Sequence, residues 1–286
     1  MKVVGTIVAA FGRHYEIELD RGGRLTGFPR GKKSPYACGD RVELAPGDDQ
    51  AQIMAHLPRS SLLYRSDEYR QKLIAANATQ LVLVVATEPA FSEELLDRAL
   101  VAAEHDELSV VFVLNKCDLK DRLPAARAVL APYAALGYPV VELCALDDAS
   151  ALRPHLAGHL SILMGQSGMG KSTLINALVP GAAAATREIS EALDSGKHTT
   201  THARLYRLDT DSRLIDSPGL QEFGLAHLGQ HEIETGFREF RPYLGLCRFR
   251  DCHHQAEPDC ALKNAVTAGA IATRRMGSFL RISQHR

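Results

Sequence analysis

Gly165-Gln-Ser-Gly-Met-Gly-Lys171-Ser172 is the stretch that decides the fold of this 286-residue chain. It matches the pattern GxxxxGK(S/T), in which backbone N–H groups of a glycine-rich loop converge on phosphate oxygens. In such a loop the lysine reaches the β- and γ-phosphates, and the hydroxyl that follows it can ligate Mg²⁺. The apolar run Leu160–Met164 predicts a buried strand before the loop, and residues 172–179 predict a helix that Pro180 ends. This strand–loop–helix order is the context that the motif requires.

Two shorter motifs lie on either side of this loop in the chain. Asn115-Lys116-Cys117-Asp118 fits NKxD, with which P-loop proteins read guanine. A carboxylate only accepts hydrogen bonds, and guanine presents two donors that adenine lacks, N1–H and the 2-amino group. Asp216-Ser-Pro-Gly219 fits DxxG. Both motifs follow apolar runs that predict strands, and ligands bind at the carboxyl ends of strands in parallel α/β sheets. This shared placement disfavours the alternative of three accidental matches.

The order of the motifs is rotated relative to an ordinary GTPase, in which the phosphate loop comes first and NKxD last. Between residues 61 and 222 strands alternate with helices, which predicts a parallel sheet covered by helices. The expected strands are 81–86, 110–114, 140–143 and 160–164, and the expected helices are 92–104 and 125–136. Cys144-Ala145 stands where GTPases carry Ser-Ala beside the base. We therefore predict an α/β P-loop GTPase domain that is circularly permuted.

Residues 1–60 contain short alternating segments separated by glycine-containing turns, which predicts a small β-barrel. An OB-fold is plausible, and such barrels bind single-stranded nucleic acid. Arg30-Gly31-Lys32-Lys33, near Phe28 and Tyr36, is a candidate phosphate-contacting loop, with a solvated hairpin loop as the alternative. The formal net charge of −1 gives no general argument for binding nucleic acid.

Three of the six cysteines fall between residues 247 and 260, in company with two histidines. Three thiolates and one imidazole form a closed tetrahedral Zn²⁺ site of the structural kind. Cys247, Cys252 and Cys260 would supply sulfur, and His253 or His254 the fourth ligand. A disulfide is one alternative, but disulfides are rare in cytosolic proteins, and a nucleotide enzyme is expected to be cytosolic. Unliganded core cysteines are another alternative.

Composition and length limit the other classes of protein. The length predicts two domains or three small ones. The longest aliphatic stretch, residues 81–86, is too short for a membrane span. The first ten residues lead straight into a strand pattern and do not resemble a signal peptide. We therefore expect a cytoplasmic protein with no membrane partner.

The segment between Pro180 and His202 shows no periodicity, and a loop of this length is usually functional or disordered. In a GTPase it corresponds to the first switch, where a threonine ligates Mg²⁺ while the γ-phosphate is present. The candidates are Thr199, Thr200 and Thr201, of which we favour Thr200. The residue after DxxG is Leu220, where many GTPases carry a glutamine that orients the attacking water. His198 is a candidate substitute, with a polar loop residue as the equal alternative.

Together these motifs resemble the ribosome small subunit-dependent GTPase A family of circularly permuted GTPases. The resemblance rests on NKxD before the phosphate loop, Gly196-Lys-His-Thr-Thr-Thr201, Asp-Ser-Pro-Gly, and a C-x4-C-x-H-x5-C cluster. It implies an OB-fold at 1–60, a permuted GTPase domain at 61–222 and a zinc-binding, mainly helical domain at 223–286. The cluster spacing selects His254 over His253. The flanking domains are implied to hold ribosomal RNA.

The resemblance and the motifs give one set of site residues. The nucleotide-binding set is Asn115, Lys116, Cys117, Asp118, Gly165, Gln166, Ser167, Gly168, Met169, Gly170, Lys171, Ser172, Thr173, Asp216 and Gly219. Ser172 and Asp216 are the expected Mg²⁺ ligands, and Lys171, Thr200 and His198 the expected catalytic residues. Cys247, Cys252, His254 and Cys260 are the expected Zn²⁺ ligands.

The implied function is a GTPase that binds the small ribosomal subunit and hydrolyses GTP to GDP. Hydrolysis would drive a late maturation step and release of the protein. The rate of hydrolysis would be low for the protein alone and higher on the subunit. We expect a monomer. The alternatives are an OB/zinc RNA-binding module that binds GTP but hardly turns it over, and a P-loop ATPase or kinase in which NKxD is accidental.

Overall fold

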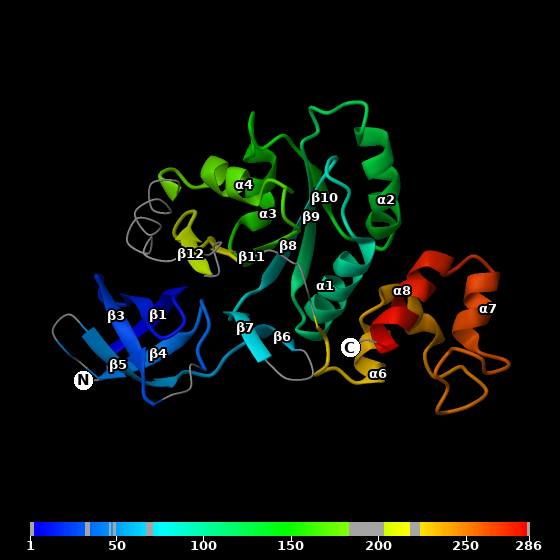
Figure 1. The fold of residues 1–286 in the computed structure, drawn as a ribbon, viewed down its shortest axis with the longest axis horizontal. Helices are drawn as coiled ribbons and strands as arrows, with labels where there is room; N and C mark the ends of the chain where they lie inside the picture. Colours follow the sequence, from blue (N-terminus) through cyan, green and yellow to red (C-terminus); the bar gives the residue numbers. More distant parts are fainter. Residues whose placement is uncertain are drawn as a thin grey trace.

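The computed structural model describes residues 3–31, 35–45, 47, 50–66, 71–182, 203–217 and 224–284. A β-barrel lies at one end of the molecule, an α/β region in the middle and a helical region at the other end (Figure 1). Among the described residues, no helix combines the length and apolar character that crossing a membrane would need.

The barrel consists of β1 Val3–Ala10, β2 Tyr15–Leu19, β3 Arg24–Pro29, β4 Arg41–Ala45 and β5 Gln50–His56. Strands pair in the order β1-β2-β3-β5-β4, and a further antiparallel pairing of β4 with β1 closes the ring. Ile7, Ile17 and Ile53 fill its interior and are fully buried. At Gly27 a Cβ atom would lie 2.3 Å from Ile17 Cδ1, so a side chain at this interior position would require Ile17 to shift. The predicted small barrel is confirmed.

A hairpin of β6 Leu62–Ser66 and β7 Gln71–Ala76 connects the barrel to the central region, an element that the sequence analysis missed. It also contacts the barrel directly. The amide of Ala76 donates to the carbonyl of Cys38 (2.9 Å), and Asn77 Nδ2 donates to the carbonyl of Gly39 (3.0 Å).

The central sheet has the strand order β10-β9-β8-β11-β13-β12. Its members are β8 Gln80–Ala86, β9 Ser109–Asn115, β10 Val140–Glu142, β11 Leu160–Met164, β12 Arg204–Arg207 and β13 Arg213–Asp216. All neighbouring pairs are parallel except β12–β13. The antiparallel strand β12 was not predicted.

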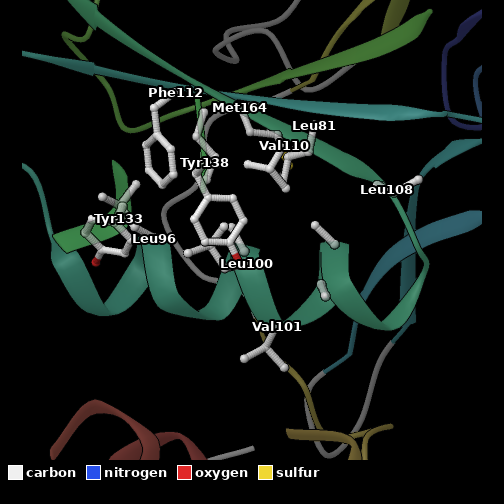
Figure 2. Packing of buried hydrophobic residues seen from close by; sticks show 14 of the residues in the cluster. Leu81, Leu96, Leu100, Val101, Leu108, Val110, Phe112, Tyr133, Tyr138 and Met164 are labelled. Atoms are coloured by element: carbon white, nitrogen blue, oxygen red, sulfur yellow. The ribbon is translucent and has the colours of Figure 1, made fainter. Parts of the chain in front are cut away.

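Helices cover both faces of this sheet. They are α1 Glu93–His105, α2 Leu123–Ala135, the 3₁₀ turn η1 Ser150–Leu152, α3 Arg153–Leu156 and α4 Lys171–Leu178. Ser92 caps α1, as its sequence indicates, by accepting a hydrogen bond from the amide of Leu95 (3.3 Å). Leu96 and Leu100 of α1 point to the sheet, where they meet Phe112 and Met164 (Figure 2).

Strand β12 forms the edge of the central sheet, and the barrel continues that edge. Ala9 of β1 pairs antiparallel with Arg204, and the amide of Ala10 donates to the carbonyl of Ala203 (3.3 Å). The two sheets therefore form one continuous 11-stranded sheet.

The C-terminal region contains α6 Gln230–Thr235, the 3₁₀ turn η2 Arg238–Tyr243, α7 Ala261–Thr267 and α8 Thr273–Gln284. It packs on the outer side of α1, where Val101 points away from the sheet (Figure 2). At Gly236 a Cβ atom would lie only 2.9–3.0 Å from three atoms of Val101. Because its first helix packs this closely, the C-terminal region shares one apolar core with the central sheet.

Candidate nucleotide-binding site and metal centre

The phosphate loop leaves β11 at Met164 and enters α4 at Lys171. A Cβ atom at Gly165 would lie 2.2 Å from the carbonyl oxygen of Val84 in the neighbouring strand. Gly170 adopts φ 87°, and a Cβ atom there would lie 2.3 Å from Asn115 Nδ2. Both positions therefore require glycine, one for close approach and one also for its left-handed conformation.

Lys171 and Asp216 face each other across the base of this loop. The Lys171 ammonium donates to the carbonyls of Gly165 (2.6 Å) and Gln166 (2.8 Å). Burial lowers the pKa of Lys171, and the nearby Asp216 carboxylate opposes that shift. Burial raises the pKa of Asp216 to about 6, against the opposing charge of Lys171. Each group thus sits in a partly desolvated site, where its charge interacts strongly with a charged ligand.

Asn115 connects the phosphate loop to the segment after β10. Its Nδ2 donates to the carbonyl of Met169 (3.0 Å), and its Oδ1 accepts from the amide of Ala145 (2.9 Å). The side chain is 2% exposed, so it serves as a buried link between two loops. The first residue of NKxD therefore positions other parts of the site.

Lys116 and Asp118 complete this motif at the surface. Lys116 has φ 61°, its ammonium donates to the carbonyl of Glu88 (2.9 Å), and its carbonyl accepts from Thr87 Oγ1 (2.9 Å). Asp118 is exposed. Partial desolvation raises the pKa of the Cys144 thiol, and a hydrogen bond with Asp118 adds to the shift. Cysteine in place of serine therefore keeps a donor beside the Asp118 carboxylate.

Cys117 and the remaining loop residues line the same region. The Cys117 amide donates to the carbonyl of Leu143 (3.2 Å), which aligns NKxD with Cys144-Ala145. Ser167 and Gly168 are exposed at the tip of the loop, and Ser172 is exposed at the start of α4 beside the half-buried Thr173. The three motifs thus come together at one edge of the sheet.

One contact at this site was missed by sequence reasoning. The Oε1 atom of Gln166 accepts a hydrogen bond from the amide of Ser92, 2.6 Å away. Gln166 occupies a variable position of the motif pattern, so only the predicted cap at Ser92 hinted at a contact. This bond ties the phosphate loop to the start of α1.

His198, Thr200 and Gly219, together with Leu220, lie outside the described residues. The last described residue of the DxxG segment is Ser217, whose hydroxyl donates to the carbonyl of Leu163 (2.9 Å).

The cysteine and histidine cluster converges in the C-terminal region. Ligand atoms of Cys247, Cys252, His254 and Cys260 all lie within 4.8 Å of one another. His254 Nδ1 is 3.3 Å from the sulfur of Cys260 and 3.6 Å from that of Cys247. His253 instead points to Gln230, with 2.6 Å between Nδ1 and Oε1. Three thiols and one ring nitrogen at this spacing fit a structural Zn²⁺ site.

Glu234 of α6 supports the histidine of this cluster. His254 Nε2 lies 3.2 Å from Glu234 Oε1, so a neutral ring with its proton on Nε2 presents Nδ1 to the thiols. A carboxylate partner of this kind fixes the tautomer of a metal-binding histidine. Sequence spacing contained no signal for Glu234, because it lies 20 residues from His254 on another element.

NKxD before the phosphate loop in the chain, with both motifs at one edge of a parallel sheet, defines a circularly permuted GTPase. The RsgA GTPase family matches residues 56–226. A small ribosomal subunit biogenesis GTPase RsgA from Nitrosospira multiformis is 54% identical over 276 residues, covering 96% of this chain and 88% of that protein. The protein of the same name from Burkholderia pseudomallei is 56% identical over 284 residues, covering 97% and 90%.

Two solved structures have the same architecture. YjeQ from Thermotoga maritima superimposes with a TM-score of 0.76 at 31% identity, covering 99% of this chain and 98% of that one. YloQ, described as a circularly permuted GTPase, gives 0.71 at 25% identity, covering 99% and 94%. This chain belongs to the RsgA GTPase family. The predicted circular permutation is confirmed.

Proposed function

We propose that this GTPase acts in biogenesis of the small ribosomal subunit, with hydrolysis driving a late maturation step and its own release. The observation that carries the GTPase part of the proposal is the buried link made by Asn115, which holds the phosphate loop and the segment after β10 together as one site. The names of the relatives supply the cellular process.

Residues of the phosphate loop bind the triphosphate in this proposal. Lys171, whose ammonium now bonds to carbonyls of its own loop, turns to the β- and γ-phosphates, and the loop amides from Gly165 to Gly170 surround them. Asp118 reads N1–H and the 2-amino group of guanine. Phosphoryl transfer requires neutralisation of developing charge and a positioned water, and Lys171 contributes to the first.

The oxygen donors of the site fit Mg²⁺. Ser172 presents a hydroxyl at the start of α4, and Asp216 presents a carboxylate at the end of β13. Hard oxygen ligands of this kind suit Mg²⁺. When bound, the ion would neutralise charge on the β- and γ-phosphates.

The segments around the γ-phosphate are assigned by sequence. Thr200 would complete the Mg²⁺ ligands, the Gly219 amide would meet the γ-phosphate, and His198 would hold the attacking water. Leu220 cannot hydrogen-bond to water, so hydrolysis is slow until the small subunit orders the site. The protein works as a cytoplasmic monomer, with the barrel and the zinc-binding region contacting ribosomal RNA.

Guanine recognition is tested by Asp118→Asn. The variant should lose about a hundredfold or more in kcat/KM for GTP, because a site built for two donors rejects mismatched partners strongly. Activity with xanthosine triphosphate should rise. Asp121→Asn, an exposed carboxylate three residues further on, is the matched control and should behave like the parent. Equal GTP use by the Asp118 variant would refute the assignment.

Stimulation is tested by GTP turnover with and without purified small subunits, and with large subunits as the control. We expect small subunits to speed GTP turnover and large subunits to leave it unchanged. His198→Ala should keep subunit binding but lose the stimulated rate. An unchanged rate with small subunits would remove the ribosomal part of the proposal while leaving the GTPase assignment in place.

A further inference from the structure

Helix α1 begins with half of a capping box. In a complete box the serine before the helix accepts from the amide at the third helical position, and a Glu or Gln side chain at that position accepts from the amide of the serine. Ser92 makes the first bond, with the amide of Leu95. Leu95 occupies the third helical position, and its apolar side chain cannot make the second bond. The amide of Ser92 therefore needs an acceptor from another element.

Gln166 of the phosphate loop supplies this acceptor. Its Oε1 atom lies 2.6 Å from the nitrogen of Ser92, 74 residues away in sequence. The segment before α1 also packs against the loop, because a Cβ atom added at Gly168 would lie 3.3 Å from Pro89. The phosphate loop thus completes the capping box of α1.

The same first turn of α1 binds α8 of the C-terminal region, which lies beside it (Figure 1). Glu93 Oε2 lies 2.7 Å from Arg274 Nε. Glu94 Oε2 lies 2.7 Å from Arg281 Nε. Asp97, one turn further on, is fully buried and lies 3.0 Å from Arg274 Nη1. The start of α1 therefore contacts the phosphate loop through its backbone and α8 through its carboxylates.

A bound nucleotide changes the bonds inside the phosphate loop. The Lys171 ammonium donates to the carbonyls of Gly165 and Gln166, and in the proposed function it turns to the phosphates. The loop amides then bond to phosphate oxygens, so the nucleotide fixes the loop at several points along its backbone. A contact made by an already ordered loop costs less conformational entropy, so the bond from Gln166 to Ser92 becomes stronger.

We infer that Gln166 is a positioning residue that couples nucleotide binding to the packing of α8 against α1, by completing the capping box of α1. The inference rests on the proposed binding of the triphosphate by this loop. A bound nucleotide favours the capped first turn, and the capped turn holds Glu93 and Asp97 in place for α8. Because coupling between two sites is reciprocal, packing of α8 in turn strengthens nucleotide binding.

Hydrogen exchange of the amides of residues 92–96 tests the coupling in the full-length protein, with and without saturating GDP. In the parent GDP should slow this exchange by about fivefold or more, the lower end of ordinary coupling between sites. Gln166→Met has a side chain of similar length that lacks the amide group. In this variant the first turn should exchange faster, and GDP should no longer slow it.

A second substitution separates the cap from the coupling. Leu95 is half-buried, and Leu95→Gln places an acceptor at the third helical position, as in a complete capping box. Added to Gln166→Met, it should restore slow exchange of the first turn, but that exchange should not depend on GDP. A purely structural role of Gln166 predicts instead that GDP affects exchange equally in the parent and in this double variant.

The affinity for GDP measures the same coupling from the other side. Arg274→Met removes pairs with the first turn of α1 and should weaken GDP binding by about fivefold. In the Gln166→Met background the same change should weaken binding no further, since the two sites are then independent. Arg241→Met is the matched control. Arg241 also belongs to the C-terminal region, but it pairs with Glu104 in the last turn of α1 (2.6 Å), so its loss should leave GDP affinity unchanged.

The outcomes separate this inference from the proposed function. Equal slowing by GDP in the parent and in Gln166→Met refutes the role of Gln166 and leaves the GTPase assignment in place. GDP affinity that is unchanged in Arg274→Met refutes it as well, and this measurement decides the question should Gln166→Met fail to fold. A parent that binds neither GDP nor GTP overturns the inference together with the proposed function.

Discussion

The C-terminal region and the barrel are attached to the central sheet in different ways. The C-terminal junction is built from side chains: Arg275 is 2% exposed and binds Asp97 of α1 and Glu239 of η2, beside the buried rings of Phe237 and Phe279. The barrel junction is built mostly from backbone. It includes the β1–β12 pairing, two partly exposed ion pairs, and close contact of Gly39 with Ala76.

This difference has consequences for both stability and motion. Removing one partner of a buried ion pair leaves an uncompensated charge, whereas exposed pairs contribute little. The loss of a single side chain should therefore destabilise the C-terminal junction strongly and the barrel junction only slightly. The phosphate loop also joins the C-terminal side, because Gln166 binds the first turn of α1, whose Glu93 and Asp97 bind Arg274 of α8.

The largest effect should come from losing zinc. Cys252→Ser should release the metal and unfold the C-terminal region, since structural zinc binding contributes on the order of 10 kcal/mol to folding. Metal analysis and limited proteolysis should show a zinc-free protein cleaved after about residue 224, with the barrel intact. His253→Ala, which changes a histidine outside the cluster, should retain zinc. Full resistance of the zinc-free variant to protease would contradict this expectation.

Arg275→Met should have the next largest effect. The change removes the guanidinium that pairs with Glu239, which is 8% exposed, while Asp97 keeps Arg274, and breaking such a buried pair costs about 3–5 kcal/mol. Urea unfolding should show the loss as an earlier transition. Arg281→Met on the same helix is the control, because that side chain is 54% exposed and its pair with Glu94 should contribute less than about 1 kcal/mol. Equal effects of the two changes would count against a buried junction.

The barrel junction should be destabilised most by a change that disturbs its backbone contacts. Gly39 has φ 93°, and a Cβ atom there would lie 2.2 Å from the carbonyl oxygen of Ala76. Gly39→Ala should therefore cost about 2–4 kcal/mol through strain and overpacking. Hydrogen exchange should show loosening between β7 and the barrel. Gly31→Ala, which also has positive φ but no atom within 4 Å of the added carbon, isolates the conformational part.

Arg207→Gln should have the smallest effect. The side chain is 51% exposed and binds Glu18 across the junction, so its loss should cost less than about 1 kcal/mol and vanish at high salt. Thermal unfolding at low and high salt measures this directly. A loss comparable to that of Arg275→Met would show that side chains, and not backbone pairing, hold the barrel.

The central elements could be predicted because their signals are local. Buried parallel strands appear as continuous apolar runs, and the phosphate loop has a fixed spacing of glycine, lysine and serine. The predicted start of α1 at Ser92 held for the same reason, since a cap depends on residues within one turn. Hairpin β6–β7 and edge strand β12 were missed, because whether a short segment forms a strand depends strongly on its packing context in the fold.

The sequence by itself determined the class of protein, the permuted order of its motifs and the cysteines and histidine of the metal cluster. These follow from residue types at fixed spacing, and the chemistry of phosphate, guanine and zinc demands those types. Tertiary structure alone decided the roles of Asn115, Gln166 and Glu234 and the attachment of the C-terminal region to α1. Each of these depends on contacts between residues far apart in the chain, which no local pattern records.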